Sequence, residues 1–274
     1  MVITISIIYL ITSTMSTYLW QNFLTDSSIL NRIKETIQKL IEEYTVTHLI
    51  EVGPGRWALT KKIVQLPVEI LCIEKDTTMD HYLAPLTKHH KNLHIHYQDV
   101  LEFNEKQIMH QKKHLIVGNL PYYITSPILR KFFWSTQALR WGGVFLIQKE
   151  VAEKIVATAP KKSFLRWLIN YAYRVEYCFS VPPKAFNPPP KVTSAVIRLS
   201  PKKDDDIPTL SYENMVTFLD QYSPYKRKTL WASSKIVAKL AKKRDSDEVM
   251  FDIMPFAEKR LEELWWEEMD KIIS

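Results

Sequence analysis

The sequence predicts an α/β fold in which an open sheet is followed by a small, all-helical region. Three observations favour this class. Short apolar runs alternate with helical patterns through the first 200 residues, the first run leads into a glycine-rich turn, and glycine-free helical patterns follow a charge-rich stretch that begins at Pro201. A chain of 274 residues with 46% hydrophobic residues can bury the core of one large and one small domain. We therefore expect an uncertain N-terminal extension over residues 1–15, a large domain over 16–201 and a small helical domain over 202–274.

The elements follow in order along the chain. Residues 1–12 are apolar but lack a basic leader and the length needed to span a bilayer, so we expect either an over-extended start or a short extension packed on the core. Asp26 then precedes an amphipathic helical pattern as its N-cap. Apolar runs predict strands at residues 48–52, 68–73, 92–97, 115–118, 143–148, 175–181 and 192–199.

The first three strands end in residues that suit a nucleoside. Gly53 and Gly55 form a turn between a strand and a helical pattern over 58–65, where residues without Cβ let a ligand approach the backbone. Glu74 ends the second strand about twenty residues on, where a carboxylate can grip ribose hydroxyls, and Asp99 follows the third strand, where it can accept from an adenine amino group. Each acid alone is compatible with a solvated loop, but the succession predicts a nucleoside pocket.

The fourth strand leads into the sequence Asn119, Leu120, Pro121 and Tyr122. An exocyclic adenine amine is a poor nucleophile, and an enzyme that alkylates it needs acceptors for its N–H bonds and a surface for the base. The side-chain oxygen of Asn119 and the carbonyl of Leu120 are such acceptors, Pro121 stiffens the turn, and Tyr122 offers a stacking face. The alternative is an ordinary strand-ending turn with a core tyrosine.

These motifs together resemble the ribosomal RNA adenine dimethyltransferase family. The resemblance runs from about Leu19 to Pro201, recurs near residues 226–230, and is carried by the following segments: 21–24, 51–55, 119–127, 148–152 and 186–196. It implies a Rossmann-like class I methyltransferase sheet closed by an antiparallel pair of strands. It also implies S-adenosyl-L-methionine as cofactor, held by these residues: Asn22, Leu24, Gly53, Glu74, Asp99 and Asn119.

Within that family the segment 123–127 looks more like the small-subunit enzymes, which modify two adjacent adenosines in a terminal hairpin. The expected partner is then small-subunit ribosomal RNA in the assembling small subunit, in the cytoplasm, with no membrane and no stable protein partner. Two alternatives stay open. One is a large-subunit enzyme that confers antibiotic resistance, and the other is a non-catalytic RNA-binding assembly factor.

Two tryptophans depart from the family pattern, because Trp20 and Trp57 stand where the family has glycine. The chain contains 5 Gly and 8 Trp, although glycine averages about 7% of residues in proteins. Some bacterial lineages read UGA as glycine, so we hypothesise that both tryptophans, and with them Trp231 and Trp265, are glycines in the native protein. The alternative is genuine divergence with a remodelled cofactor pocket, and the coding DNA distinguishes the two.

The charge distribution favours a polyanionic partner. The net charge is +7, and a stretch without acids over residues 221–244 holds eight basic residues. We expect phosphate contacts from five of these: Lys226, Arg227, Lys228, Lys235 and Lys239. Phe186, in a proline-rich loop, either packs beside the target base or fastens the loop to the core. Two cysteines are too few for a disulfide framework, and His94 and His96 lack further ligands, so no metal site is expected.

Overall fold

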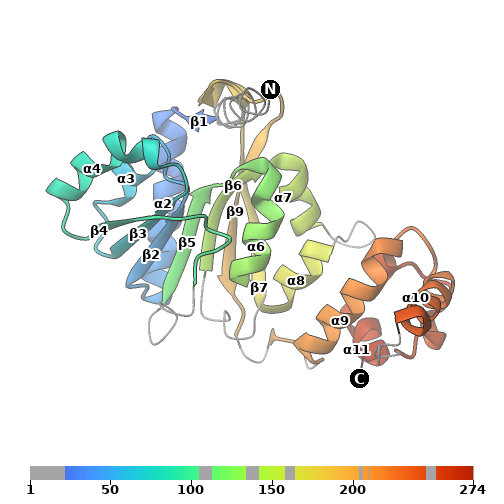
Figure 1. The fold of residues 1–274 in the computed structure, drawn as a ribbon. Coiled ribbons are helices and arrows are strands. Elements are labelled where there is room, and N and C mark those ends of the chain that lie inside the picture. Colours follow the sequence, from blue (N-terminus) through green and yellow to red (C-terminus); the bar gives the residue numbers. More distant parts are fainter. Residues whose placement is uncertain are drawn as a thin grey trace, which may run out of the picture.

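The computed structural model describes residues 22–104, 113–133, 142–157, 164–203, 206–208, 210–244 and 251–273. Seven strands form one twisted sheet in the order β4-β3-β2-β5-β6-β9-β7, with helices packed against it (Figure 1). The strands from β4 to β6 are parallel, and β9 pairs antiparallel with both β6 and β7. This confirms the predicted α/β class and the antiparallel closing pair. The N-terminal extension and Trp20 lie outside the described residues.

The strands of the sheet lie where the apolar runs predict them. Their bounds are β2 (His48–Val52), β3 (Glu69–Glu74), β4 (Leu93–Tyr97), β5 (His114–Asn119), β6 (Gly142–Gln148), β7 (Tyr173–Val181) and β9 (Ser194–Pro201). The helices of the large region are α2 (Ser27–Tyr44), α3 (Thr60–Ile63), α4 (Asp80–His89), α6 (Thr125–Phe133), α7 (Lys149–Val156) and α8 (Phe164–Ala172). No helix in the described part of the chain is both long and apolar enough to cross a bilayer.

Helix α2 forms as its sequence pattern predicts. The side chain of Asp26 accepts a hydrogen bond from the backbone N–H of Ile29 at 3.0 Å, which satisfies one of the free donors at the helix start. The apolar residues at helical spacing are all buried, and they are Ile29, Leu30, Ile33, Ile37, Leu40 and Ile41. Burial of one stripe against the sheet therefore fixes the helix next to β6, β5 and β9.

A second, two-stranded sheet fastens the proline-rich loop. Strand β1 (Phe23–Leu24) pairs antiparallel with β8 (Phe186–Asn187), in a register that places Leu24 opposite Phe186. Phe186 is 4% exposed and packs in the same hydrophobic cluster as Leu24. Because the Phe186 ring is buried, this arrangement favours the alternative in which Phe186 fastens the loop to the core over contact with a base.

The C-terminal helices are α9 (Tyr212–Tyr222), α10 (Leu230–Arg244) and α11 (Trp266–Ile273), and they form a group beside α8 (Figure 1). The hydroxyl of Tyr171 on α8 donates to the Leu210 carbonyl at 2.9 Å, and the two rings of Tyr171 and Tyr212 meet edge to face. The hydrophobic cluster of the sheet continues through these contacts into α9. The helical group thus rests on α8 through a shared core.

Candidate functional site

The predicted acceptor Asn119 is the last residue of β5, a central strand of the parallel part of the sheet. Its side-chain amide donates to the backbone carbonyl of Asn22 at 3.1 Å. This bond uses one of the two N–H groups of the amide, and the side-chain oxygen can still accept. The segment before β1 therefore orients Asn119 across 97 residues of sequence.

The next residues form a turn whose backbone groups are held separately. The N–H of Leu120 donates to the Leu146 carbonyl at 3.0 Å, so β6 holds the turn from its neighbouring side. The Pro121 carbonyl accepts from Ile124 N–H at 3.1 Å and from the Thr125 hydroxyl at 3.0 Å. Among the described residues, no backbone group donates to the Leu120 carbonyl. The two predicted acceptors, Asn119 and Leu120, are thus consecutive residues at the start of a turn whose other backbone groups are held.

Tyr122 begins the short 3-10 helix η2 (Tyr122–Ile124) directly after this turn. Its ring is partly exposed, and its hydroxyl lies 2.6 Å from the Ser194 hydroxyl. Burial raises the pKa of the Tyr122 phenol above its ordinary value, although the Ser194 contact lowers it. The ring therefore remains neutral at physiological pH, which suits a face that stacks on a neutral base.

The glycine-rich turn lies at the end of β2. Gly53 and Gly55 have φ angles of +65° and +53°, in the left-handed region that favours glycine. An added Cβ on Gly53 would meet no atom within 4 Å, so a ligand can approach the backbone there. The N–H of Gly55 donates to the Glu74 carboxylate at 3.1 Å. A hydrogen bond therefore joins the turn after β2 to the acid at the end of β3.

Glu74 is 6% exposed, so the alternative of a solvated loop carboxylate is wrong. Its second carboxylate oxygen accepts from Asp76 N–H at 2.8 Å. Burial raises its pKa, against the lowering effect of the backbone N–H donors of Asp76, Gly55 and Lys75. Each carboxylate oxygen accepts one of these bonds and retains a further lone pair for a ribose hydroxyl.

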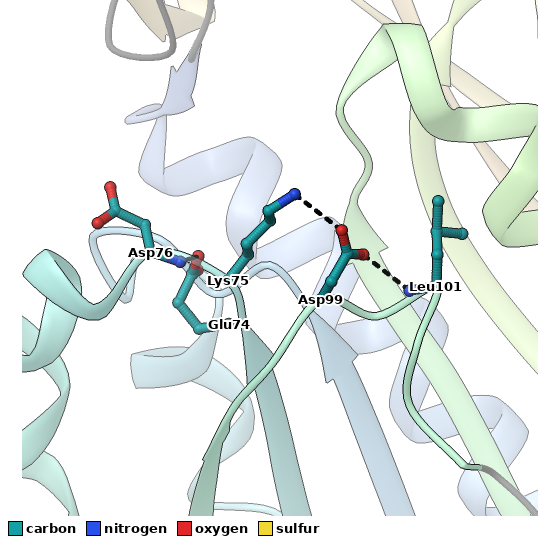
Figure 2. A network of polar contacts seen from close by, with 5 residues as sticks. All are labelled: Glu74, Lys75, Asp76, Asp99 and Leu101. Carbon is teal, nitrogen blue, oxygen red and sulfur yellow. Dashed lines mark hydrogen bonds and ion pairs between the residues drawn. The ribbon is translucent and has the colours of Figure 1, made fainter. Parts of the chain in front are cut away.

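Asp99 lies after β4 on the same edge and forms an ion pair with Lys75 at 2.8 Å (Figure 2). Its other oxygen accepts from Leu101 N–H at 2.9 Å. The Lys75 hydrogen bond is the main cause that lowers the pKa of Asp99, and it raises that of Lys75 in turn. Asp99 therefore stays ionised at neutral pH, as an acceptor for an adenine amino group must.

A third acid, which sequence reasoning did not single out by function, lies beneath the turn. Glu51 on β2 is 2% exposed and accepts a weak hydrogen bond from the Cys72 thiol on β3 at 3.4 Å. Burial raises the pKa of Glu51 to about 7 and raises that of Cys72 as well. An acid within the apolar run of residues 49–52 was the available signal.

Trp57 has a φ angle of +63°, and Thr45 is the other described non-glycine residue with positive φ. A bulky residue in this region is a conformational outlier. The helix predicted over residues 58–65 is shorter, because only Thr60–Ile63 is helical after Trp57. The indole is partly buried, and its ring lies 6.1 Å from that of Tyr82. The backbone at position 57 therefore has the conformation of a glycine.

The residues at this edge fit the predicted cofactor by their chemistry. An open backbone approach at Gly53, a buried carboxylate at Glu74 and an ionised one at Asp99 follow three adjacent parallel strands, β2, β3 and β4. Nucleoside ligands bind at this end of such sheets. Two further residues predicted to bind the cofactor, Asn22 and Leu24, precede α2 in the chain. Asn22 contributes its carbonyl to Asn119, whereas the Leu24 side chain is 4% exposed and belongs to the core.

The predicted phosphate contacts lie on and before α10, away in sequence from the sheet edge. The five side chains are all exposed, and none forms an ion pair with another described residue; they are Lys226, Arg227, Lys228, Lys235 and Lys239. Lys235 lies 4.5 Å above the ring of Trp231, which is 44% exposed. Positions 231, 235 and 239 share one face of the helix.

Comparison with known proteins finds relatives along most of the chain. A family model described as ribosomal RNA adenine dimethylase matches residues 13–262. Ribosomal RNA small subunit methyltransferase A from Legionella pneumophila (strain Corby) is 35% identical over 82% of this chain and 86% of its own length. The protein of the same name from Hydrogenovibrio crunogenus is 34% identical over 77% of this chain and 79% of its own.

Solved structures agree in fold. A dimethyladenosine transferase from Plasmodium falciparum superposes with a TM-score of 0.69 at 24% identity, over 91% of this chain and 95% of that one. The 23S rRNA methyltransferase ErmE superposes with a TM-score of 0.65 at 22% identity, over 92% of this chain and 99% of that one. At these identities the likeness concerns the fold alone.

Proposed function

The chain belongs to the ribosomal RNA adenine dimethylase family, and we propose that it dimethylates two adjacent adenosines in a hairpin near the 3′ end of small-subunit (16S) rRNA. Its activity is that of the family: it is an S-adenosylmethionine-dependent methyltransferase that acts on the N6 amines of adenines in ribosomal RNA. The relatives above 30% identity carry the small-subunit name, whereas the large-subunit enzyme matches at 22% and in fold only. The small-subunit substrate is therefore preferred over the large-subunit alternative.

The observation that carries the mechanism is the orientation of Asn119 by the Asn22 carbonyl. With one N–H of its amide donated to Asn22, the Asn119 oxygen and the Leu120 carbonyl offer two acceptors to the N–H bonds of one amino group. Accepting both bonds directs the lone pair of the amine away from the turn, toward the side where the cofactor residues lie. Bound S-adenosylmethionine supplies an electrophilic methyl group there.

Positioning rather than proton removal is the main task of these residues. Fixed geometry of this kind can be worth effective molarities of about 10⁵ M or more. The amine becomes cationic as it is methylated, so its proton can leave to water or to a weak acceptor such as the neutral Asn119. The ring of Tyr122 holds the extruded base by stacking.

The proposed cofactor residues lie at the ends of several strands, and different residues contact different parts of the ligand. Gly53 admits the ligand to the backbone, Gly55 supports the Glu74 carboxylate through its N–H, Glu74 accepts from the ribose hydroxyls, and Asp99 accepts from the adenine amino group. Asn22, Leu24 and Asn119 complete this set from the chain before α2 and from β5, with Leu24 acting through its backbone because its side chain is buried.

The basic residues around α10 are proposed to hold the RNA backbone while the large region handles the base. Five exposed cations without a carboxylate partner among the described residues support phosphate contacts, because such contacts release counterions and dominate RNA affinity. In this proposal residues 16–201 bind the target base and residues 202–274 bind the RNA backbone. The proposed partner is the assembling small ribosomal subunit, in the cytoplasm.

Primer extension on purified RNA tests the substrate. The protein is incubated with S-adenosylmethionine and either small-subunit or large-subunit RNA, and dimethylated adenines are read as stops. We expect two adjacent stops in the small-subunit RNA alone. Stops in the large-subunit RNA would instead favour the resistance enzyme. Binding without stops in either RNA, together with no heat of S-adenosylmethionine binding by titration calorimetry, would favour the non-catalytic assembly factor.

A further inference from the structure

The hydroxyl of Ser194 is the one polar contact made by the ring of Tyr122 within the described residues, at 2.6 Å. We infer that Ser194 is a positioning residue for methyl transfer, which holds the Tyr122 ring in the orientation that receives the base. The inference rests on the proposed function, because it assumes that Tyr122 stacks on the target adenine.

Ser194 is a rigid point from which to hold a ring. It begins β9, it is 0% exposed, and its backbone lies between two antiparallel partners, Gln148 on β6 and Val181 on β7. Tyr122, in contrast, lies in a three-residue 3-10 helix and is partly exposed. The hydrogen bond therefore ties a short surface turn to the interior of the sheet.

This hydrogen bond limits the rotation of the Tyr122 side chain, whose ring face must be correctly oriented to stack on a base. A tyrosine ring without a partner can turn about χ1 and χ2, whereas a hydrogen bond between its hydroxyl and a fixed hydroxyl restricts χ1 directly. It restricts χ2 through the preference of the phenolic O–H for the plane of the ring. The backbone of the same turn is already held by Leu146 and Thr125. Ser194 adds the missing restraint on the side chain, so the stacking face is set before the base arrives.

A competing explanation is that the bond only satisfies a buried hydroxyl. A structural role of that kind predicts lower stability with unchanged turnover in the folded enzyme. A positioning role predicts lower kcat for methyl transfer at unchanged RNA and cofactor affinity. The two can be separated because Ser194→Ala and Tyr122→Phe remove the same bond from opposite ends.

Ser200→Ala supplies the matched control. Ser200 lies on the same strand, is also buried, and accepts from the Arg198 side chain at 3.0 Å, away from the turn. We expect its turnover to equal that of the wild type.

The experiment measures single-turnover methyl transfer to small-subunit RNA for wild type, Ser194→Ala, Tyr122→Phe, the double variant and Ser200→Ala. We expect each single variant to be slower by about 10- to 100-fold. The double variant should be no slower than either single variant, because the same bond is lost. RNA and cofactor affinities should be unchanged. Tyr122→Phe alone carries the test if Ser194→Ala does not fold.

Wild-type rates in Ser194→Ala or Tyr122→Phe would overturn the inference and leave the proposed function standing. Losses that multiply in the double variant would also overturn it, because the two residues would then act independently. An inactive wild-type protein would overturn the proposed function and this inference together.

Discussion

The buried acid beneath the glycine-rich turn gives a prediction whose sign and size follow from the structure. Glu51 has a pKa raised by burial from 4.5 to about 7. The folded protein therefore keeps the Glu51 proton at pH values where the unfolded chain has lost it. The contribution of Glu51 to stability is complete below pH 4.5 and is lost as the pH rises to about 7, and it changes no further above that value.

The size follows from the same shift. Each pKa unit corresponds to about 1.4 kcal/mol, so the rise amounts to about 3 kcal/mol of unfolding free energy between the two ends of the window. Glu51→Gln cannot titrate and lacks this dependence. The difference in unfolding free energy between wild type and Glu51→Gln should therefore decline by about 3 kcal/mol from pH 4.5 to pH 7.

Urea unfolding at closely spaced pH values and constant ionic strength measures this difference. Glu74 has a raised pKa as well, but its contribution is present in both proteins and cancels when they are compared. Parallel stability curves for wild type and Glu51→Gln would refute the reasoning, because they would mean that Glu51 is ionised in the folded protein throughout the window.

Three further predictions concern binding. Glu74→Ala should weaken S-adenosylmethionine binding and leave RNA affinity nearly unchanged, since both the ribose acceptor and the support of the Gly55 N–H are lost; calorimetry that shows equal losses would indicate a structural role. Neutralising Lys226, Lys228 and Lys239 should lower RNA affinity and flatten its salt dependence by about 0.7–0.9 log units per lost contact, with cofactor binding unchanged. Parallel salt titrations would mean that these lysines only face solvent. Trp57→Gly should fold and bind S-adenosylmethionine at least as tightly, because a left-handed residue with a side chain costs about 1–2 kcal/mol. A UGG codon at this position would rule out recoding, and weaker binding by Trp57→Gly would show that the indole has become part of the pocket.

Local sequence patterns, namely helical spacing and apolar runs, predicted most of the fold. Helix α2 follows from Asp26 and an apolar stripe at helical spacing, and the seven strands follow from apolar runs long enough to be distinct. Strands β1 and β8 have two residues each, which is too short for any period, and their pairing joins segments more than 160 residues apart. The buried state of Phe186 depends on that pairing and was not predictable from its loop.

The site was predictable at the level of which residues gather, because the carboxyl ends of parallel strands meet at one edge. Its internal bonds were not. The bond from Tyr122 to Ser194 spans 72 residues, and the ion pair between Lys75 and Asp99 spans 24. Such contacts depend on how the strands align in register. Neither the composition nor the residue spacing of the sequence indicates them. The short helix α3 likewise depends on the backbone angle of Trp57.

The proposed role of Asn119 in methyl transfer is that of a positioned, neutral acceptor. Its most direct test is the single-turnover rate of Asn119→Ala on small-subunit RNA, with RNA binding and thermal unfolding measured on the same protein. The variant removes one oriented contact and leaves β5 packed, so we expect the rate to fall by about 10²- to 10³-fold, or about 2.7–4 kcal/mol, with fold and RNA affinity retained. Wild-type turnover by Asn119→Ala would contradict the account.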